Sequence, residues 1–176
     1  MAYTNVNGLQ SALVEINDYL RVERSDVMGI TETKLTEVIE ENKIREGEYN
    51  IWVRNRAEKQ GGSVMLLVKK DLVAYELRND YGLAEVVGAE VVCRGGVKRD
   101  FVVVYALPKT NSWNTEDFKK KMEDTKRWKE YLMETKEKLV MMGDFNSKEV
   151  KWDDSDGMVV KIHGVESCYE WQWKTH

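Results

Sequence analysis

The chain has 176 residues, 42% hydrophobic and 33% charged, a composition that fits one globular domain with a core and excludes a disordered chain. The net charge of -4 excludes a protein that binds nucleic acid through a broadly basic surface, so any such contact needs a local site. No apolar run approaches the ~18 residues of a membrane-spanning helix, so we expect no membrane partner.

The first half of the chain alternates apolar runs of strand length with amphipathic segments. The apolar runs predict strands at residues 2–6, 26–30, 49–53 and 63–68. Between the first two, one helical face is formed by Leu9, Ala12, Leu13, Ile16 and Leu20. A charged helix is expected at residues 37–45 and a polar loop at 54–62. The strand at 63–68 is apolar enough to be buried on both faces.

The second half begins with a run of strands and ends in a helix followed by a strand. Strands are expected at residues 72–77, 84–93 and 101–105, the second of them broken near Gly88. The segment Arg-Gly-Gly-Val at 94–97 predicts a hairpin turn. A long helix is expected at 115–135, capped by Asn114 or Thr115 and with four candidate buried positions, Phe118, Met122, Trp128 and Leu132. A last apolar strand follows at 139–142.

This order of elements predicts an α/β fold, a mixed-sheet α/β sandwich. The early strand-helix-strand crossovers favour parallel pairing, and the middle hairpins favour antiparallel pairing. Helices on the outer faces of a mixed sheet satisfy both.

Polar side chains follow three of the predicted strands where each strand ends. Asn5 and Asn7 follow the first, Glu32 the second, and Asp144 and Asn146 the last. Open α/β sheets bind their ligands beyond the carboxyl ends of strands. Carboxylates from two separate strands would make an oxygen-rich site of the kind that Mg²⁺ prefers, and such a site suits phosphoryl chemistry. Tyr105 could place a phenolic hydroxyl at the same rim.

Each of these residues also has an ordinary structural interpretation. Gly-Asp-Phe-Asn at 143–146 could be a strand-ending turn. Glu32 could be a solvated loop acid, and Asn5 and Asn7 could be turn residues or helix N-caps. Tyr105 could be a half-buried strand aromatic. Their common placement at carboxyl ends of strands favours the functional interpretation.

Five motifs carry a resemblance to a known family. They are Thr4-Asn5-Val6-Asn7-Gly8-Leu9, Gly29-Ile30-Thr31-Glu32-Thr33-Lys34, Gly61-Gly62-Ser63-Val64, Val104-Tyr105-Ala106-Leu107-Pro108 and Gly143-Asp144-Phe145-Asn146. In order and spacing the chain resembles the endonuclease/exonuclease/phosphatase superfamily over about residues 2–152. The branch that it resembles is the apurinic-type endonuclease domain at the front of non-LTR retrotransposon polyproteins, which also carry a reverse transcriptase.

The resemblance implies a two-sheet α/β sandwich that hydrolyses phosphodiesters of DNA with Mg²⁺ or Mn²⁺. Its motif positions imply catalytic roles for Asp144, Asn146 and Tyr105, and metal roles for Glu32 and Asn5. Asp144 would orient or deprotonate the attacking water, and Asn146 would contact the phosphate. Candidate substrate contacts are Asn7, Asn111, Arg54 and Arg56, the two arginines through the DNA backbone. Asn7 stands where many relatives have an aspartate.

The chain departs from the family pattern in its last part. The family carries a terminal Ser-Asp-His, and neither His163 nor His176 is preceded by Ser-Asp. We therefore expect residues 1–152 to form the N-terminal portion of the domain, truncated after the Gly-Asp-Phe-Asn strand, and residues 153–176 to form a divergent tail. The cysteines, Cys93 and Cys168, lack metal-like spacing and fit an intracellular compartment, nuclear or cytoplasmic.

Three functions are compatible with these motifs. The first is a metal-dependent, DNA-nicking endonuclease-like domain of a retrotransposon. The second is a catalytically degenerate remnant that keeps the fold as a binding module, which the missing Ser-Asp-His favours. The third is a phosphatase of the same superfamily that acts on a small phosphoester.

Overall fold

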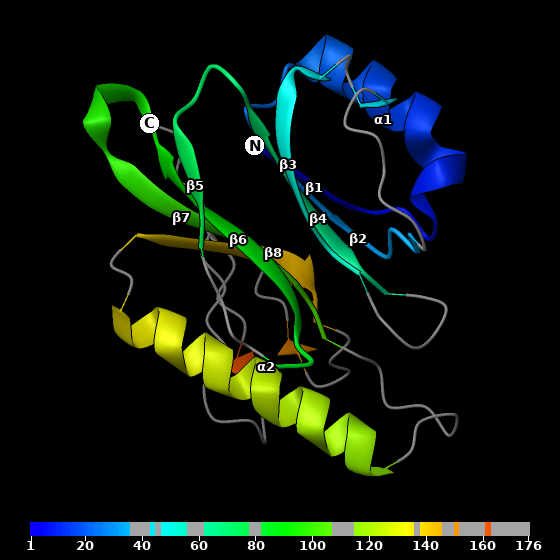
Figure 1. The fold of residues 1–176 in the computed structure, drawn as a ribbon, viewed down its shortest axis with the longest axis vertical. Coiled ribbons are helices and arrows are strands. Elements are labelled where there is room, and N and C mark those ends of the chain that lie inside the picture. Colours follow the sequence, from blue (N-terminus) through cyan, green and yellow to red (C-terminus); the bar gives the residue numbers. More distant parts are fainter. Residues whose placement is uncertain are drawn as a thin grey trace.

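The computed structural model describes residues 1–35, 43–44, 47–55, 62–77, 82–106, 115–135, 138–145, 150–151 and 161–162. Two four-stranded sheets pack face to face, with one long helix on the outer side of each (Figure 1). The predicted mixed-sheet α/β sandwich is confirmed.

The N-terminal sheet has the strand order β1-β2-β4-β3. Its strands are β1 (Ala2–Asn5), β2 (Val27–Thr31), β3 (Tyr49–Arg54) and β4 (Val64–Lys69). Helix α1 (Leu9–Glu23) connects β1 to β2, which pair in parallel, and β4 is antiparallel to both of its neighbours. The carboxyl ends of β1 and β2 therefore lie at the same edge as the beginning of β4.

The C-terminal sheet has the strand order β5-β6-β7-β8. Its strands are β5 (Ala74–Glu76), β6 (Glu85–Val92), β7 (Lys98–Tyr105) and β8 (Leu139–Asp144). A 3-10 turn, η3 (Arg94–Gly96), joins β6 to β7 as the predicted hairpin, and α2 (Thr115–Thr135) lies between β7 and β8. Strands β7 and β8 pair in parallel, with Tyr105 opposite Asp144. Beyond the sandwich, β9 (Val150–Lys151) and β10 (Lys161–Ile162) form an antiparallel pair.

Three apolar clusters hold the layers together. The largest lies between the sheets and joins residues such as Leu66 and Val103. A second joins α1 to the N-terminal sheet, and a third joins Trp128 and Leu132 of α2 to the C-terminal sheet. Strand β4 is buried on both faces from Val64 to Val68, as predicted, because it is central in its sheet between α1 and the facing sheet.

Two details of the second half differ from the prediction. Strand β6 runs unbroken through Gly88, where a Cβ would lie 3.0 Å from Val102 Cγ2 and 3.1 Å from the Phe101 carbonyl oxygen. The glycine there allows β7 to pack closely against β6 and does not interrupt the strand. Met122, predicted to be buried, is 38% exposed, whereas Trp128 and Leu132 are each 1% exposed.

Several predictions fall outside the described residues. They concern most of the helix expected at 37–45, the cap residue Asn114, and the boundary between the domain and the tail at 152. Among the helices that the structure describes, none combines the length and the apolar character needed to cross a membrane.

Candidate active site

The side chains of Glu32 and Asp144 meet at one amide group. The Asn5 Nδ2 atom donates a hydrogen bond to Glu32 Oε1 at 3.1 Å and another to Asp144 Oδ2 at 3.1 Å. Asn5 ends β1, Glu32 follows β2, and Asp144 ends β8. Three strand ends from both sheets, including two 139 positions apart in sequence, thus place their polar groups together.

The orientation of the Asn5 amide follows from its second contact. The backbone N–H of Asn7 donates to Asn5 Oδ1 at 3.2 Å, which leaves the amide nitrogen facing the carboxylates. This contact is the one that an Asn side chain makes in a turn, so Asn5 is a turn residue as well as a neighbour of the two carboxylates. In this conformation Asn5 offers the carboxylates a donor, while its oxygen is engaged by the backbone.

The segment 32–34 is fixed by backbone hydrogen bonds on two sides. Glu32 has a φ of 54°, a left-handed conformation that costs energy in a residue other than glycine. Its carbonyl oxygen accepts the Gly8 N–H at 2.8 Å. On the other side, the N–H groups of Thr33 and Lys34 donate to the carbonyl oxygens of Ser63 and Gly62 at 3.4 and 3.1 Å. These contacts hold Glu32 at the site.

Two tyrosines border the carboxylates. Tyr105, buried at the end of β7, donates a long hydrogen bond of 3.4 Å from its hydroxyl to Glu32 Oε1. The Tyr3 hydroxyl lies 2.9 Å from Thr31 Oγ1. Burial raises the pKa of the Tyr3 phenol above its ordinary 10.0, the Thr31 contact partly offsets this, and the charges of Asp144 and Glu32 raise it further. The sequence reasoning missed Tyr3, although it precedes Asn5 by two positions, a spacing that puts both on one face of β1.

Asn7 is not the cap of α1. The N-cap position is Gly8, with no side-chain capping bond, and Asn7 Oδ1 instead accepts a hydrogen bond from Lys34 Nζ. The N-cap interpretation of Asn7 is therefore wrong. Lys34 was also missed, and its signal was its place in the same Glu-Thr-Lys segment as Glu32.

Gly143 lets β8 bring Asp144 to the site. A Cβ at Gly143 would lie 1.9 Å from the Val104 carbonyl oxygen and 2.8 Å from the Val104 carbonyl carbon. Only a residue without a side chain permits this approach of β8 to β7. The glycine of Gly-Asp-Phe-Asn thus has a packing role that fixes the next residue.

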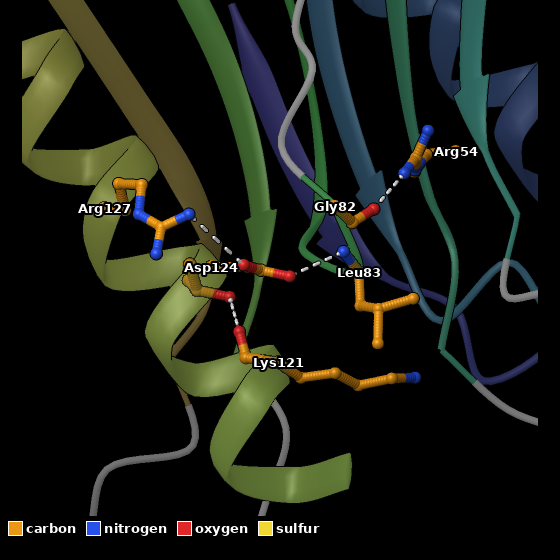
Figure 2. A network of polar contacts seen from close by, with 7 residues as sticks. Arg54, Gly82, Leu83, Lys121, Asp124 and Arg127 are labelled. Atoms are coloured by element: carbon orange, nitrogen blue, oxygen red, sulfur yellow. Dashed lines mark hydrogen bonds and ion pairs between the residues drawn. The ribbon is translucent and has the colours of Figure 1, made fainter.

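Arg54 lies in a separate network that ties β3 to the turn before β6 and to α2 (Figure 2). Its Nη2 donates to the Gly82 carbonyl oxygen at 2.6 Å, and the next residue, Leu83, donates its N–H to Asp124 Oδ2 at 2.9 Å. Arg127 Nη1 is 3.9 Å from Asp124 Oδ1. One of the several N–H donors of Arg54 is thus used within the fold.

The donor set fits one divalent ion with retained waters. Two carboxylates that share one hydrogen-bond donor face the same point, and carboxylate oxygens are the ligands that Mg²⁺ and Mn²⁺ accept. Within the described ranges, no group of three or more His, Cys, Asp or Glu side chains is placed to hold a metal ion. Glu32 would supply a carboxylate ligand, with Asp144 beside it, and water would complete the shell. The metal role expected of Asn5 stays a prediction.

Three of the predicted site residues lie outside the described part of the chain. They are Arg56, Asn111 and Asn146. Of the others, the structure brings Asn5, Glu32, Tyr105 and Asp144 together, and the backbone N–H of Asn7 bonds to Asn5 beside them.

Solved structures with this fold include three nucleic-acid enzymes. The 3′ phosphatase NExo from Neisseria, solved with a product DNA hairpin, is 18% identical with a TM-score of 0.61 over 84% of this chain and 57% of its own. An AP endonuclease from Archaeoglobus fulgidus is 20% identical, with a TM-score of 0.59 over 84% of this chain and 57% of its own. The endonuclease domain of TRAS1, a telomere-specific non-LTR retrotransposon, is 16% identical, with a TM-score of 0.59 over 87% of this chain and 64% of its own. The chain thus spans 57% to 64% of the length of these structures, and the likeness concerns the fold.

Sequence comparison gives the family. No curated protein sequence matches the chain. The model of the Endonuclease/Exonuclease/phosphatase family matches residues 2–162, which include both carboxylates, Asn5 and both sheets. The chain belongs to the endonuclease/exonuclease/phosphatase family.

Proposed function

We propose that this chain is a metal-dependent phosphodiesterase domain that nicks DNA, of the kind found in non-LTR retrotransposons. The observation that carries the proposal is the meeting of Glu32 and Asp144 at the Asn5 amide, from three strand ends in two sheets. Family membership supports hydrolysis of phosphoesters, and the motif resemblance supports DNA as the substrate.

Each described residue has a defined part in the proposed reaction. Glu32 would hold Mg²⁺ or Mn²⁺, which when bound supplies positive charge against the charge that develops on the phosphate oxygens. Asp144 would orient a water and accept its proton as that water attacks phosphorus. The bond from phosphorus to the leaving sugar oxygen would break, and that oxygen would take a proton from solvent water. Asn5 would keep the two carboxylates at a fixed separation. The Tyr105 hydroxyl, already directed at the site, would donate to a phosphate oxygen.

Two residues outside the described part of the chain would complete the contacts. Asn146 would bind the phosphate, and Arg56 would meet the DNA backbone with Arg54. Because the net charge is -4, these contacts would be local, and binding would depend on few phosphates.

The direct test is nicking of supercoiled plasmid with Mg²⁺ or Mn²⁺ and with a chelator. We expect nicked circles only with the metal, and a loss of at least about 100-fold in rate for Glu32→Ala, since a metal ligand in this site carries several kcal/mol of transition-state stabilisation. Glu90→Ala is the matched control. Glu90 lies on β6 and pairs with Lys98 Nζ at 2.7 Å, so its loss should leave nicking unchanged.

A catalytically degenerate binding module is the second candidate, because Asn7 stands where many relatives of the family that the chain resembles have an aspartate. Calorimetric titration with Mg²⁺ separates the two. Metal binding that Glu32→Ala abolishes, without nicking by the wild type, would assign the degenerate function. Faster turnover of a soluble phosphomonoester than of plasmid would instead assign the phosphatase.

A further inference from the structure

Glu85 is a buried acid at the same edge of the sandwich. It begins β6, lies opposite Tyr105 of β7 and is 4% exposed. A carboxylate buried between two apolar sheets is costly unless it accepts hydrogen bonds, so its position calls for a partner.

Glu85 connects the two sheets through a backbone group. Its Oε2 accepts the Ser63 N–H at 2.9 Å, across the interface between β6 and the residue that precedes β4. Ser63 is 2% exposed and has a φ of 72°, a left-handed conformation that costs about 1–3 kcal/mol in a residue other than glycine. The bond from Glu85 therefore helps to hold Ser63 in a conformation that it would otherwise leave.

Ser63 in turn holds the segment that carries Glu32. Its carbonyl oxygen accepts the Thr33 N–H at 3.4 Å, and the carbonyl oxygen of Gly62 accepts the Lys34 N–H at 3.1 Å. Thr33 is 1% exposed, so water does not replace the Ser63 carbonyl as its partner. A continuous path of hydrogen bonds thus runs from Glu85 through Ser63 to Thr33, the residue that follows Glu32.

We propose that Glu85 is a positioning residue that fixes Glu32 through Ser63. The inference rests on the function proposed above and adds a residue that touches neither substrate nor metal. Glu32 and Lys34 have left-handed φ values of 54° and 51°, so segment 32–34 depends on external contacts to keep its shape. Loss of the Glu85 acceptor releases Ser63, and Glu32 then leaves the Asn5 amide for part of the time.

The test uses Glu85→Met, which keeps about the volume of the side chain and removes the acceptor of the buried Ser63 N–H, at a cost of about 1–3 kcal/mol. Urea unfolding first checks that the variant is folded. Glu85→Gln keeps an acceptor oxygen and removes the charge. Glu90→Met is the matched control on the same strand. For each variant, Mn²⁺ affinity is measured by calorimetry, and hydrogen exchange is measured at the amides of Thr33 and Lys34.

For Glu85→Met we expect about tenfold weaker Mn²⁺ binding, as for other groups that orient a metal ligand, and faster exchange at Thr33 and Lys34. Amides within β4, such as Leu66, should keep their protection. Glu85→Gln should stay within about twofold of the wild type, because its amide oxygen still accepts the Ser63 N–H. The Glu90 variant should match the wild type.

Wild-type Mn²⁺ affinity and wild-type exchange in Glu85→Met would overturn the inference, and so would an equal loss of affinity in Glu85→Gln and Glu85→Met. If Glu32→Ala bound Mn²⁺ as tightly as the wild type, the proposed function would fail instead. The exchange rates at Thr33 and Lys34 would still decide the role of Glu85.

Discussion

The acids at the strand ends and the acid on α2 lie in different electrostatic surroundings. Asp124 accepts a backbone N–H from Leu83 and faces the guanidinium of Arg127, beside a turn that Arg54 also binds (Figure 2). In the described part of the chain, the side-chain partners of Glu32 are the neutral amide of Asn5 and the neutral hydroxyl of Tyr105.

The difference separates an acid whose contacts hold the fold together from the acids of the proposed metal site. A carboxylate that pairs with a cation and accepts a backbone hydrogen bond stabilises the fold. Little of its negative potential then remains to attract a ligand. Glu32, whose described side-chain partners are neutral, keeps its negative potential, which is what a divalent ion requires. Three pairs of variants can break or sharpen this comparison.

The largest effect is expected from the two glycines. Gly143→Ala would drive a Cβ into the backbone of Val104. Gly82→Ala, at a φ of 54°, would first meet the side-chain carboxylate of Asp124, which can shift at the expense of its bond to Leu83. We expect a loss of about 3 kcal/mol or more in the free energy of unfolding for Gly143→Ala and about 1–2 kcal/mol for Gly82→Ala. Urea unfolding measures both. Equal losses would show that β8 can move away from β7 without cost.

Removal of charge should have opposite consequences for the two kinds of acid. Asp124→Asn weakens the bonds to Leu83 and Arg127 and should cost about 1 kcal/mol of stability, without change in Mn²⁺ binding. Asp144→Asn relieves repulsion from Glu32, so its stability should be equal to that of the wild type or higher by up to about 1 kcal/mol, while nicking is lost. Thermal unfolding and the plasmid assay check both. A destabilised Asp144→Asn would mean that this carboxylate has mainly a structural role.

The smallest effect is expected from Tyr3. Its raised pKa means that the folded chain holds the phenolic proton more tightly than the unfolded chain does. The resulting stability is fully present below about pH 10 and is lost as the pH rises through the folded pKa. Tyr3→Phe should therefore lose less stability than the wild type when the pH is raised from about 9 to 11. Tyr75→Phe, at a side chain that is 60% exposed, is the control and should follow the wild type.

Apolar patterning was sufficient to predict the strands and the layers. The runs at 63–68 and 101–105 became the central strands β4 and β7, because β-branched and apolar residues favour a sheet covered on both faces. The break expected near Gly88 was wrong, since glycine in a strand signals either a break or a close neighbour, and the neighbour here comes from another strand. The local sequence does not predict such a contact.

The candidate site was predictable in its residues and less so in its geometry. Polar residues at strand ends indicated Asn5, Glu32, Tyr105 and Asp144, which the structure brings together. The sequence could not show which atom of the Asn5 amide faces the carboxylates, because the Asn7 backbone decides it. Glu85 was not predicted either, since the backbone N–H that it accepts belongs to Ser63, which precedes a strand of the other sheet.

The hydrogen bond between Asn5 and Asp144 also constrains when the site can form. These residues are 139 positions apart, and contacts of such long range form late in folding. During synthesis, β1, α1 and β2 can pair as soon as they leave the ribosome, whereas Glu32 waits for its neighbouring acid until β8 has docked beside β7. The nascent chain therefore holds only one of the two carboxylates in place until β8 has docked, and a chain that is interrupted before residue 144 never brings the two carboxylates together.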